Sequence, residues 1–420
     1  MTSRSIDVTA LGPGGEGFGT VDGVRVSIDG ALPGERWSVV REGRGWAAGS
    51  CEIASPDRVA PGCAVFGRCG GCTWQHAGPA LQREAHLDRL RRGLPASLRT
   101  TPIAYVPSEL RYGYRTRARL AWSVRKDGVR LGFRARRSDD LVDIPGCPVL
   151  DAAISDALPA MRSALRALGG RGEVALALGE GGRPVASLHP VASFGSEGFT
   201  VGRELCVAGF AGVALWAPGA SAPQVDGDPR PVTLGADGAP LHAAIAGFAQ
   251  AHASLNGALA SHVATEAAAG ERTVIELFAG AGNFTVLLAA NARRVAAVEG
   301  DAAAVEALRA NVALRGLGNV TVRHAAVDGS VDLRRADVVV LDPPRGGARD
   351  ACEAVAKAGV RRVVYVSCDP ETLGRDLGVL LGTHEVLGIT AFEMFPQTPG
   401  VEAVVTLVRA GRSPKAAPRA

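Results

Sequence analysis

The chain has 420 residues, of which 47% are hydrophobic and 21% charged, and its formal net charge is +4. This length exceeds the usual size of one core, so two or three domains are expected, and the composition excludes a largely disordered chain. No apolar run approaches the roughly 20 residues that span a bilayer, and the N-terminal segment lacks the apolar stretch of a secretory signal. We therefore expect a cytoplasmic monomer without a membrane partner, whose cysteines serve metal binding, catalysis or packing rather than disulfides.

Residues 1–55 alternate short β-rich runs with glycine turns, which is typical of a small barrel. The strand VDGVRVSI followed by the turn ALPGE resembles the TRAM module, an OB-like RNA-binding barrel. Taken alone, the pattern would fit an ordinary small β domain equally well.

Residues 56–245 have mixed signals and are expected to form a central α+β domain. Cys63, Cys69 and Cys72 lie in CAVFGRCGGCTWQH, and Cys147 follows in DIPGCPVL. Three close thiols and a distant fourth predict a four-ligand metal site, for which zinc and an iron–sulfur cluster are both allowed. Three further cysteines lie outside this pattern and are expected to be ordinary packing residues: Cys51, Cys206 and Cys352.

The stretch 111–137 contains ten basic residues and one acidic residue, interleaved with aromatic residues. Basic side chains bind phosphate, and aromatic planes stack on exposed bases. A strand with one solvated side would show the same alternation of charge. Beside a barrel that resembles an RNA-binding module, RNA binding is the better interpretation, with Arg115, Arg117 and Arg119 as the predicted contacts.

Residues 246–410 repeat short apolar runs separated by helical segments: TVIELFAG, RVAAVEG, NVTVRHA, DVVVLDPP and RRVVYVSC. Such runs indicate a parallel sheet buried on both faces. The last two runs, HEVLGITAFEMF and VEAVVTLVRA, are too close for a helical crossover and should pair antiparallel. This arrangement is that of class I, Rossmann-like methyltransferases. The tail 411–420 is expected to be disordered.

The run ELFAGAGNFTV places Gly280 and Gly282 in a turn between a strand and a helix, which predicts nucleoside or dinucleotide binding. Glu299 ends the next strand, where a carboxylate can accept hydrogen bonds from both ribose hydroxyls. Asp342 follows a further strand and opens DPPR. All these positions are expected along the carboxyl edge of the sheet, where ligands of open α/β sheets bind.

Cys368 follows the apolar strand VVYVS and faces the same edge. A lone cysteine is usually a small buried hydrophobe, but this one lies in the loop zone, where reactive groups gather. The final hairpin brings Glu402 to the start of a strand beside the one that carries Cys368. We therefore predict Cys368 as a nucleophile and Glu402 as a base.

The chain resembles the RNA (uracil-5-)-methyltransferase family. The resemblance covers most of the chain and rests on FAQAHASLN at 248–256, followed in the family's order by ELFAGAGNF, VEG, LDPPR, YVSCDPETLGRDL and FPQTPGVEAV. It implies S-adenosyl-L-methionine as cofactor and structured RNA as partner. Members with this cysteine motif usually modify 23S ribosomal RNA, whereas some relatives act on transfer RNA.

The resemblance also implies roles for individual residues. Cys368 would attack carbon 6 of uracil, and Glu402 would remove the proton from carbon 5. Asp342 would contact uracil or cofactor, and the cysteine cluster would hold [4Fe-4S] rather than zinc. Three more positions match cofactor-binding residues of the family: Gln250, Phe278 and Asn283.

Two residues depart from the family pattern. His252 stands where asparagine is usual, which leaves the role of that position open, and Asp369 replaces the commoner asparagine after the nucleophile, which could slightly raise its pKa. An amino-group methyltransferase is an alternative, because its sites also use a D-P-P motif, but they place an aromatic residue where this chain has Arg345. A catalytically decayed iron–sulfur RNA-binding protein is the non-enzymatic alternative.

Overall fold

The computed structural model describes residues 3–43 and 45–411, which pack into two compact units. Each unit combines segments distant in sequence: unit 1 contains Met1–Arg89, Pro107–Pro231 and Met394–Gly400, and unit 2 contains Leu90–Val106, Val232–Glu393 and Val401–Ala420. The predicted disordered tail lies outside the described residues, apart from its first residue. Across the described residues, no helix is long and apolar enough to cross a membrane.

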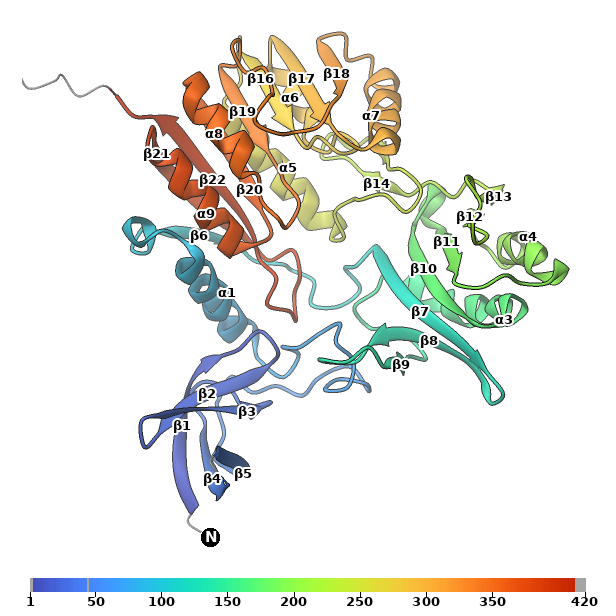
Figure 1. The fold of residues 1–420 in the computed structure, drawn as a ribbon, viewed down its shortest axis with the longest axis vertical. Coiled ribbons are helices and arrows are strands. Elements are labelled where there is room, and N and C mark those ends of the chain that lie inside the picture. The colour runs from blue at the N-terminus through green and yellow to red at the C-terminus, as the bar shows by residue number, and fades with distance from the viewer. Residues whose placement is uncertain (1–2, 44, 412–420) are drawn as a thin grey trace, which may run out of the picture. The chain divides into compact units, whose positions relative to one another are not determined.

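Unit 1 begins with an antiparallel five-stranded sheet in the order β3-β2-β1-β4-β5 (Figure 1). Its strands are β1 (Ser3–Leu11), β2 (Glu16–Val21), β3 (Val24–Asp29), β4 (Arg36–Glu42) and β5 (Gly45–Ile53). Ile6, Val8, Val26 and Ile28 share one buried core, because alternate residues of each strand face the same side. A small β domain is thus present, whereas its assignment as a TRAM barrel stays a prediction.

The second sheet of unit 1 has the order β13-β12-β11-β10-β7-β8-β9. Its strands are β7 (Arg117–Arg125), β8 (Gly128–Arg134), β9 (Leu141–Asp143), β10 (Arg171–Leu178), β11 (Pro184–Pro190), β12 (Gly212–Leu215) and β13 (Gln224–Gly227). The accompanying helices are α2 (Ala152–Asp156), α3 (Leu158–Leu168) and α4 (Val201–Val207). Leu120, Leu176 and Leu188 share a core with Met161 of α3 and Leu205 of α4, so the helices cover one face of this sheet.

Unit 2 contains an eight-stranded sheet in the order β18-β17-β16-β19-β20-β22-β21-β6 (Figure 1). Its strands are β6 (Ile103–Val106), β16 (Thr273–Leu277), β17 (Arg294–Glu299), β18 (Val320–His324), β19 (Val338–Leu341), β20 (Arg362–Ser367), β21 (His384–Phe392) and β22 (Glu402–Arg409). The strands from β18 to β20 pair in parallel, and β22 is antiparallel to both of its neighbours. The predicted parallel sheet ending in an antiparallel hairpin is confirmed.

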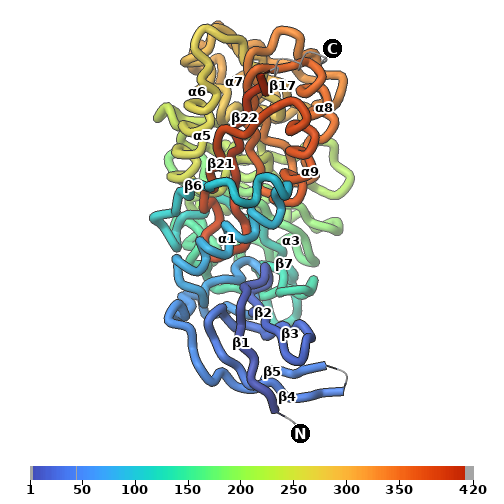
Figure 2. The backbone as a smooth tube through the Cα atoms, turned by 90° about the vertical axis from the view of Figure 1, so that its left-hand side faces the viewer, coloured from blue at the N-terminus to red at the C-terminus, as the bar shows by residue number. Residues whose placement is uncertain are grey.

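Strand β6 lies parallel to β21, with Ile103 opposite Ile389 and Val106 opposite Phe392 (Figure 2). Nothing in the sequence indicates this pairing, because IAYV is short and lies in the stretch expected to belong to the central domain. By pairing with β21, β6 satisfies backbone groups that an edge strand would leave exposed. Helix α1 (Pro79–Gly93) precedes β6 and begins in unit 1.

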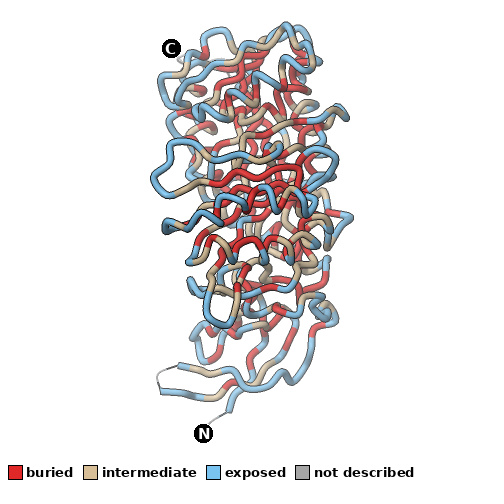
Figure 3. Tube along the Cα trace, turned by 90° about the vertical axis from the view of Figure 1, so that its right-hand side faces the viewer, coloured by how far each residue is buried: buried red, intermediate tan, exposed pale blue. Residues whose placement is uncertain are grey.

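Helices bury both faces of the strands that carry the site. They are α5 (Ala253–Ala267), α6 (Thr285–Asn291), α7 (Ala302–Leu314), α8 (Arg349–Ala358) and α9 (Pro370–Leu380), and the hairpin β14 (Val232–Leu234) and β15 (Pro240–His242) packs beside α7. All four residues of β19 are completely buried, and Figure 3 shows the buried segments towards the inside of the trace and the exposed segments towards its outside. Such a sheet leaves only its strand ends open to ligands.

Candidate active site

The carboxyl ends of β19 and β20 carry the residues predicted to perform the chemistry. Asp342 follows β19, and Cys368 follows β20. Strand β20 pairs with β22 so that Ser367 lies opposite Ala403. Continuing this antiparallel register places Cys368 opposite Glu402, so the predicted nucleophile and base lie at the same edge of the sheet.

The glycine turn after β16 runs close to the end of β17. Phe278, Gly280 and Gly282 have φ angles of 61°, 55° and 96°. Among the described residues, no atom lies within 4 Å of where a Cβ on Gly280 would be, whereas one on Gly282 would lie 2.6 Å from Leu308 Cδ1. The turn therefore leaves its backbone accessible at Gly280 and packs tightly at Gly282.

Glu299 is held at the end of β17 by backbone groups. The Gly280 N–H donates to Glu299 Oε2 at 2.9 Å, and the Asp301 N–H donates to Oε1 at 2.8 Å. A carboxylate oxygen has two lone pairs, so each oxygen can accept a further hydrogen bond. The Glu299 carboxylate is therefore held in one orientation and can accept hydrogen bonds from the two hydroxyl groups of a diol.

Asn283, also predicted to contact cofactor, pairs with Asn256 of α5. The Nδ2 of Asn256 donates to Oδ1 of Asn283 at 2.8 Å, and the Nδ2 of Asn283 donates back at 2.9 Å. This reciprocal pair connects α5 to the glycine turn. Gln250 is buried in the segment just before α5.

The structure gives His252 a local role. The backbone N–H of Leu255 donates to His252 Nδ1 at 3.3 Å, so the imidazole is the N-cap of α5. Burial lowers the pKa of His252 to about 4, which keeps the ring neutral and able to accept. Because asparagine is also a favoured N-cap residue, histidine here can replace it without loss of the cap.

The environment of Cys368 favours the neutral thiol. Burial raises its pKa to about 11, with further increases from the charges of Glu402 and Asp342. Arg345 opposes these effects and lowers the pKa of Cys368. Arg345 is therefore placed to stabilise the thiolate.

Two carboxyl groups lie beside this cysteine: Glu402 is buried, and Asp342 is half-buried. Burial raises the pKa of Asp342 to about 7. The pKa of Glu402 is also raised well above its usual value, by burial and the charge of Asp342, and Arg345 lowers it. Like charges this close disfavour joint ionisation, so the pair holds a proton more tightly than either acid would in water.

Arg345 is the residue of this site that the sequence interpretation missed. In the sequence interpretation, Arg345 serves only as an argument against an amino-group methyltransferase, which would have an aromatic residue at this position. Arg345 nevertheless lies three positions after Asp342 in the same motif. This short distance from Asp342 along the loop after β19 was the feature of the sequence that could have indicated a role for Arg345.

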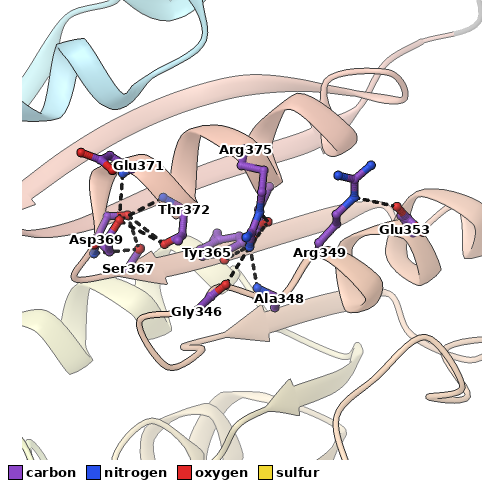
Figure 4. A network of polar contacts seen from close by, with 11 residues as sticks. Gly346, Ala348, Arg349, Glu353, Tyr365, Ser367, Asp369, Glu371, Thr372 and Arg375 are labelled. Carbon is purple, nitrogen blue, oxygen red and sulfur yellow. Dashed lines mark hydrogen bonds and ion pairs between the residues drawn. The ribbon is translucent and has the colours of Figure 1, made fainter.

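The loop after β19 is held by a buried network around Asp376 (Figure 4). The Ala348 N–H and the Tyr365 hydroxyl both donate to Asp376 Oδ2 at 2.6 Å. Arg375 Nη2 donates to the Gly346 carbonyl at 2.8 Å. These contacts anchor the loop to α9 and β20.

Asp369 serves α9 as its N-cap, since its Oδ1 accepts from the N–H groups of Glu371 and Thr372, each at 3.0 Å (Figure 4). Burial, Glu402 and Asp342 are the main causes of the raised pKa of Cys368. Asp369 is not among these causes, and its carboxylate accepts hydrogen bonds from the first turn of α9.

In unit 1, the four predicted metal ligands line one cavity: Cys63, Cys69, Cys72 and Cys147. Burial raises the pKa of Cys72 to about 12, and the charges of Cys147 and Cys69 add to the increase. Across the described residues, no three cysteine, histidine or acidic side chains are close enough to hold a single metal ion. The four thiols thus surround a shared space without forming a compact single-ion site.

The three arginines predicted to bind RNA have different surroundings. Arg115 lines the cysteine cavity, and its charge lowers the pKa of Cys72. Arg119 is 66% exposed and lies 3.6 Å from the Glu173 carboxylate. Between them, Arg117 has its pKa lowered to about 10, by burial and by the charges of both neighbouring arginines.

Comparison with known proteins identifies relatives over nearly the whole length of the chain. A relative from Klebsiella pneumoniae, named 23S rRNA (uracil(1939)-C(5))-methyltransferase RlmD, is 34% identical and covers 97% of each chain. A protein of the same name from Alkalilimnicola ehrlichii is 33% identical and covers 96% of each. The chain belongs to the RNA (uracil-5-)-methyltransferase family. The family model for tRNA (uracil-5-)-methyltransferases matches residues 242–410.

A solved structure of a family member supports the fold. The tRNA (uracil-54, C5)-methyltransferase of Pyrococcus abyssi, in complex with S-adenosyl-L-homocysteine, aligns with a TM-score of 0.74 at 24% identity, covering 96% of this chain and 100% of that one. The predicted family and Rossmann-like methyltransferase fold are therefore confirmed. Membership in this family excludes the alternative of an amino-group methyltransferase.

Proposed function

We propose that this chain methylates carbon 5 of a uridine in 23S ribosomal RNA, with S-adenosyl-L-methionine as methyl donor, Cys368 as nucleophile and Glu402 as base. The observation that carries the proposal is the strand register that sets Cys368 opposite Glu402, beside Asp342 and Arg345. Carbon 5 of uracil is too weakly nucleophilic to accept a methyl group without covalent activation. The target uridine must be unpaired or flipped out to reach this edge.

In the proposed reaction, the Cys368 thiol gives its proton to solvent and the sulfur bonds to carbon 6 of uracil. The electrons of the C5–C6 double bond then make carbon 5 nucleophilic. Arg345 stabilises the thiolate before attack. After methylation, Glu402 removes the carbon 5 proton, the double bond forms again, and the sulfur leaves.

The glycine turn and its neighbours fit a nucleoside cofactor. Gly280 gives access to the backbone, and the Glu299 carboxylate keeps lone pairs for ribose hydroxyls. When bound, the cofactor supplies an electrophilic methyl group on its sulfonium. Residues Gln250, Phe278, Gly282, Asn283 and Asp342 complete the proposed cofactor set.

The choice of ribosomal over transfer RNA follows relatives that cover nearly the whole chain and carry the ribosomal name. Transfer RNA remains the alternative, in keeping with the family model and the Pyrococcus structure. Incubating purified protein with unmodified 23S RNA and with unmodified transfer RNA, followed by mapping of 5-methyluridine, separates the two. Methylation of transfer RNA alone would overturn the choice.

We also propose that the four cysteines bind a [4Fe-4S] cluster. They supply the Cys₄ ligand set of such clusters and line one cavity. The cluster would supply a structural or redox centre to unit 1. Protein purified without oxygen should contain about four irons per chain. One zinc ion per chain without iron would show that the four cysteines bind zinc and not an iron–sulfur cluster.

Residues 1–55 are proposed as a TRAM-like RNA-binding barrel, 56–245 as the iron–sulfur and RNA-binding domain, and 246–410 as the methyltransferase domain. The antiparallel five-stranded sheet supports the first assignment, and the shared cysteine cavity supports the second. Removing residues 1–55 should weaken RNA binding and leave cofactor binding intact. Unchanged RNA affinity would remove that role from the barrel.

The test of the chemistry is Cys368→Ala, which should abolish methyl transfer while leaving cofactor affinity nearly unchanged, because the thiolate activates uracil rather than holding the cofactor. Radiolabelled methyl transfer to RNA measures the first effect, and titration calorimetry measures the second. Cys51→Ala is the matched control, since Cys51 is an exposed cysteine of β5. Substantial turnover by Cys368→Ala would refute the mechanism, and a folded wild-type protein that binds RNA without methylating it would favour the decayed alternative.

A further inference from the structure

The seven-stranded sheet of unit 1 has two unlike faces. Helices α3 and α4 cover the face that carries apolar side chains such as Leu188. Side chains that alternate with the apolar ones point to the opposite face. The polar residues placed there by the strand register are Arg119 on β7, Glu173 on β10, and Ser187 and His189 on β11.

An aromatic pair lies on this polar face. The rings of His189 and Trp216 are stacked, with 5.9 Å between their centroids and 10° between their planes. Trp216 Nε1 donates to Ser187 Oγ at 3.1 Å, and the same hydroxyl is hydrogen-bonded to His189 Nε2 at 2.9 Å. Ser187 therefore holds both rings in fixed orientations, and both remain partly exposed.

The surroundings of His189 favour the neutral imidazole. Burial and the charge of Arg119 lower the pKa of His189, and the charge of Glu173 only partly offsets this. A neutral ring beside an indole presents a flat surface without charge of its own. Such a surface suits a nucleobase, because every base has a π-face.

A cation lies near the rings. Arg119 and Ser187 both lie opposite Ala175 of β10, so one strand with a small side chain separates Arg119 from Ser187, and the charge of Arg119 acts on His189. Two strand spacings are about 10 Å, a short step along an RNA strand. The partner of Arg119 is the exposed Glu173, and exposed ion pairs are weak, so a phosphate can take the place of the carboxylate.

We propose that Trp216 and His189 form a stacking platform for an unpaired base of the RNA substrate, with Arg119 binding an adjacent phosphate and Ser187 positioning the rings. Aromatic planes combined with cations are the usual means of binding single-stranded RNA. The inference rests on the proposed function in taking RNA as the ligand.

The test compares binding of a fluorescent single-stranded RNA of roughly ten nucleotides with binding of an RNA duplex, using the full-length protein. Trp216→Ala should raise the Kd for the single strand about tenfold, as expected for removal of one base–aromatic stack. Trp216→Phe should keep most of the affinity, and Ser187→Ala should lose part of it. Arg119→Gln should lower the slope of log Kd against log salt by about 0.7, whereas Trp216→Ala should leave the slope unchanged.

Phe199→Ala is the matched control, because Phe199 is an exposed aromatic residue beside α3 and α4 and should not affect binding. Thermal unfolding verifies that each variant is folded. Wild-type affinity in both Trp216→Ala and His189→Ala, or equal losses for single strand and duplex, would overturn the platform. If wild-type protein fails to methylate 23S RNA while Trp216→Ala still selectively weakens single-strand binding, the platform stands and the proposed function fails.

Discussion

The two large sheets of this molecule carry their polar residues in different places. In unit 2 the polar residues gather at strand ends, where Cys368 and Glu402 lie opposite one another. In unit 1 they lie on the face of the seven-stranded sheet opposite α3 and α4, which we call the open face and on which Arg119 is exposed and His189 is partly exposed. The difference follows from what covers each sheet. Helices on both faces of a parallel sheet leave only its edge for chemistry, whereas helices on one face leave the other for a ligand.

The two arrangements suit different tasks. A strand end fixes a side chain within a buried setting, and burial shifts the pKa values of Cys368, Asp342 and Glu402 together. An open face instead offers exposed cations and partly exposed rings over several strands. We therefore expect substitutions at the edge in unit 2 to affect the reaction and those on the face in unit 1 to affect RNA binding.

The largest expected effect is that of Glu402→Gln, which should lower turnover about 10³-fold, as expected for loss of a general base. Cysteine attack and methyl transfer should still occur, but the carbon 5 proton that blocks release of the sulfur should remain. A methylated RNA–protein adduct should then accumulate and migrate with the protein on a denaturing gel. The adduct should be absent from the Cys368→Ala, Glu402→Gln double variant. Normal turnover without a trapped species would show that another group removes the proton.

Arg345→Met should lower the single-turnover rate about 100-fold, the size of effect seen when a preorganised electrostatic partner is removed. The pKa of Cys368, about 11, already includes the lowering effect of Arg345, so loss of Arg345 should raise it further. The wild-type rate should rise with pH between 6 and 8 as the thiolate fraction grows, and less steeply above about pH 7, where Asp342 ionises and its charge raises the pKa of Cys368. The curve of single-turnover rate against pH should be shifted to higher pH in Arg345→Met. An unchanged profile would mean that Arg345 does not act on the thiol.

A smaller effect is expected on the open face of unit 1. Replacing Arg117 and Arg119 with glutamine should weaken RNA binding and lower its salt slope by about 0.7 for each phosphate of the single strand that the protein no longer binds. Arg115→Gln should instead affect the iron content, because Arg115 lines the cysteine cavity. Filter binding at several salt concentrations and iron assay separate these outcomes. If only Arg115→Gln lowers the salt slope, then Arg115 binds RNA, and the assignment of RNA binding to Arg117 and Arg119 is wrong.

The smallest effect on activity is expected from Glu276→Gln, inside β16 rather than at its end. Thr285 Oγ donates to the Glu276 carboxyl at 2.5 Å, and burial raises its pKa from 4.5 to about 8. The folded state thus holds this proton more tightly than the unfolded state, so its contribution to stability is full below pH 4.5 and declines as the pH rises towards 8. Glutamine should remove this decline and stabilise the protein at pH 8 by on the order of 1 kcal/mol. Denaturant unfolding at several pH values measures the free energy of unfolding of both proteins. If its pH dependence is the same in Glu276→Gln and the wild type, groups other than Glu276 cause that dependence.

Much of unit 2 could be predicted from the sequence. Apolar runs such as VVVL predict buried strands, and the short link between the last two runs predicts the hairpin that brings Glu402 beside Cys368. The roles assigned to these residues stay predictions until the variants are measured. In unit 1, cysteine spacing was enough to group the four thiols, which the structure places around one cavity.

The sequence by itself determined which segments form the strands that carry the chemistry and that the last two pair antiparallel, because apolar runs and linker lengths are local properties of the chain. Only the tertiary structure decided that Arg345 meets Cys368, that Trp216 stacks on His189, and that β6 joins a sheet whose other strands begin only at Thr273. These contacts join residues whose own neighbours in sequence give no sign of the partner. They form because packing, burial and strand pairing act across the whole fold, and no local pattern encodes them.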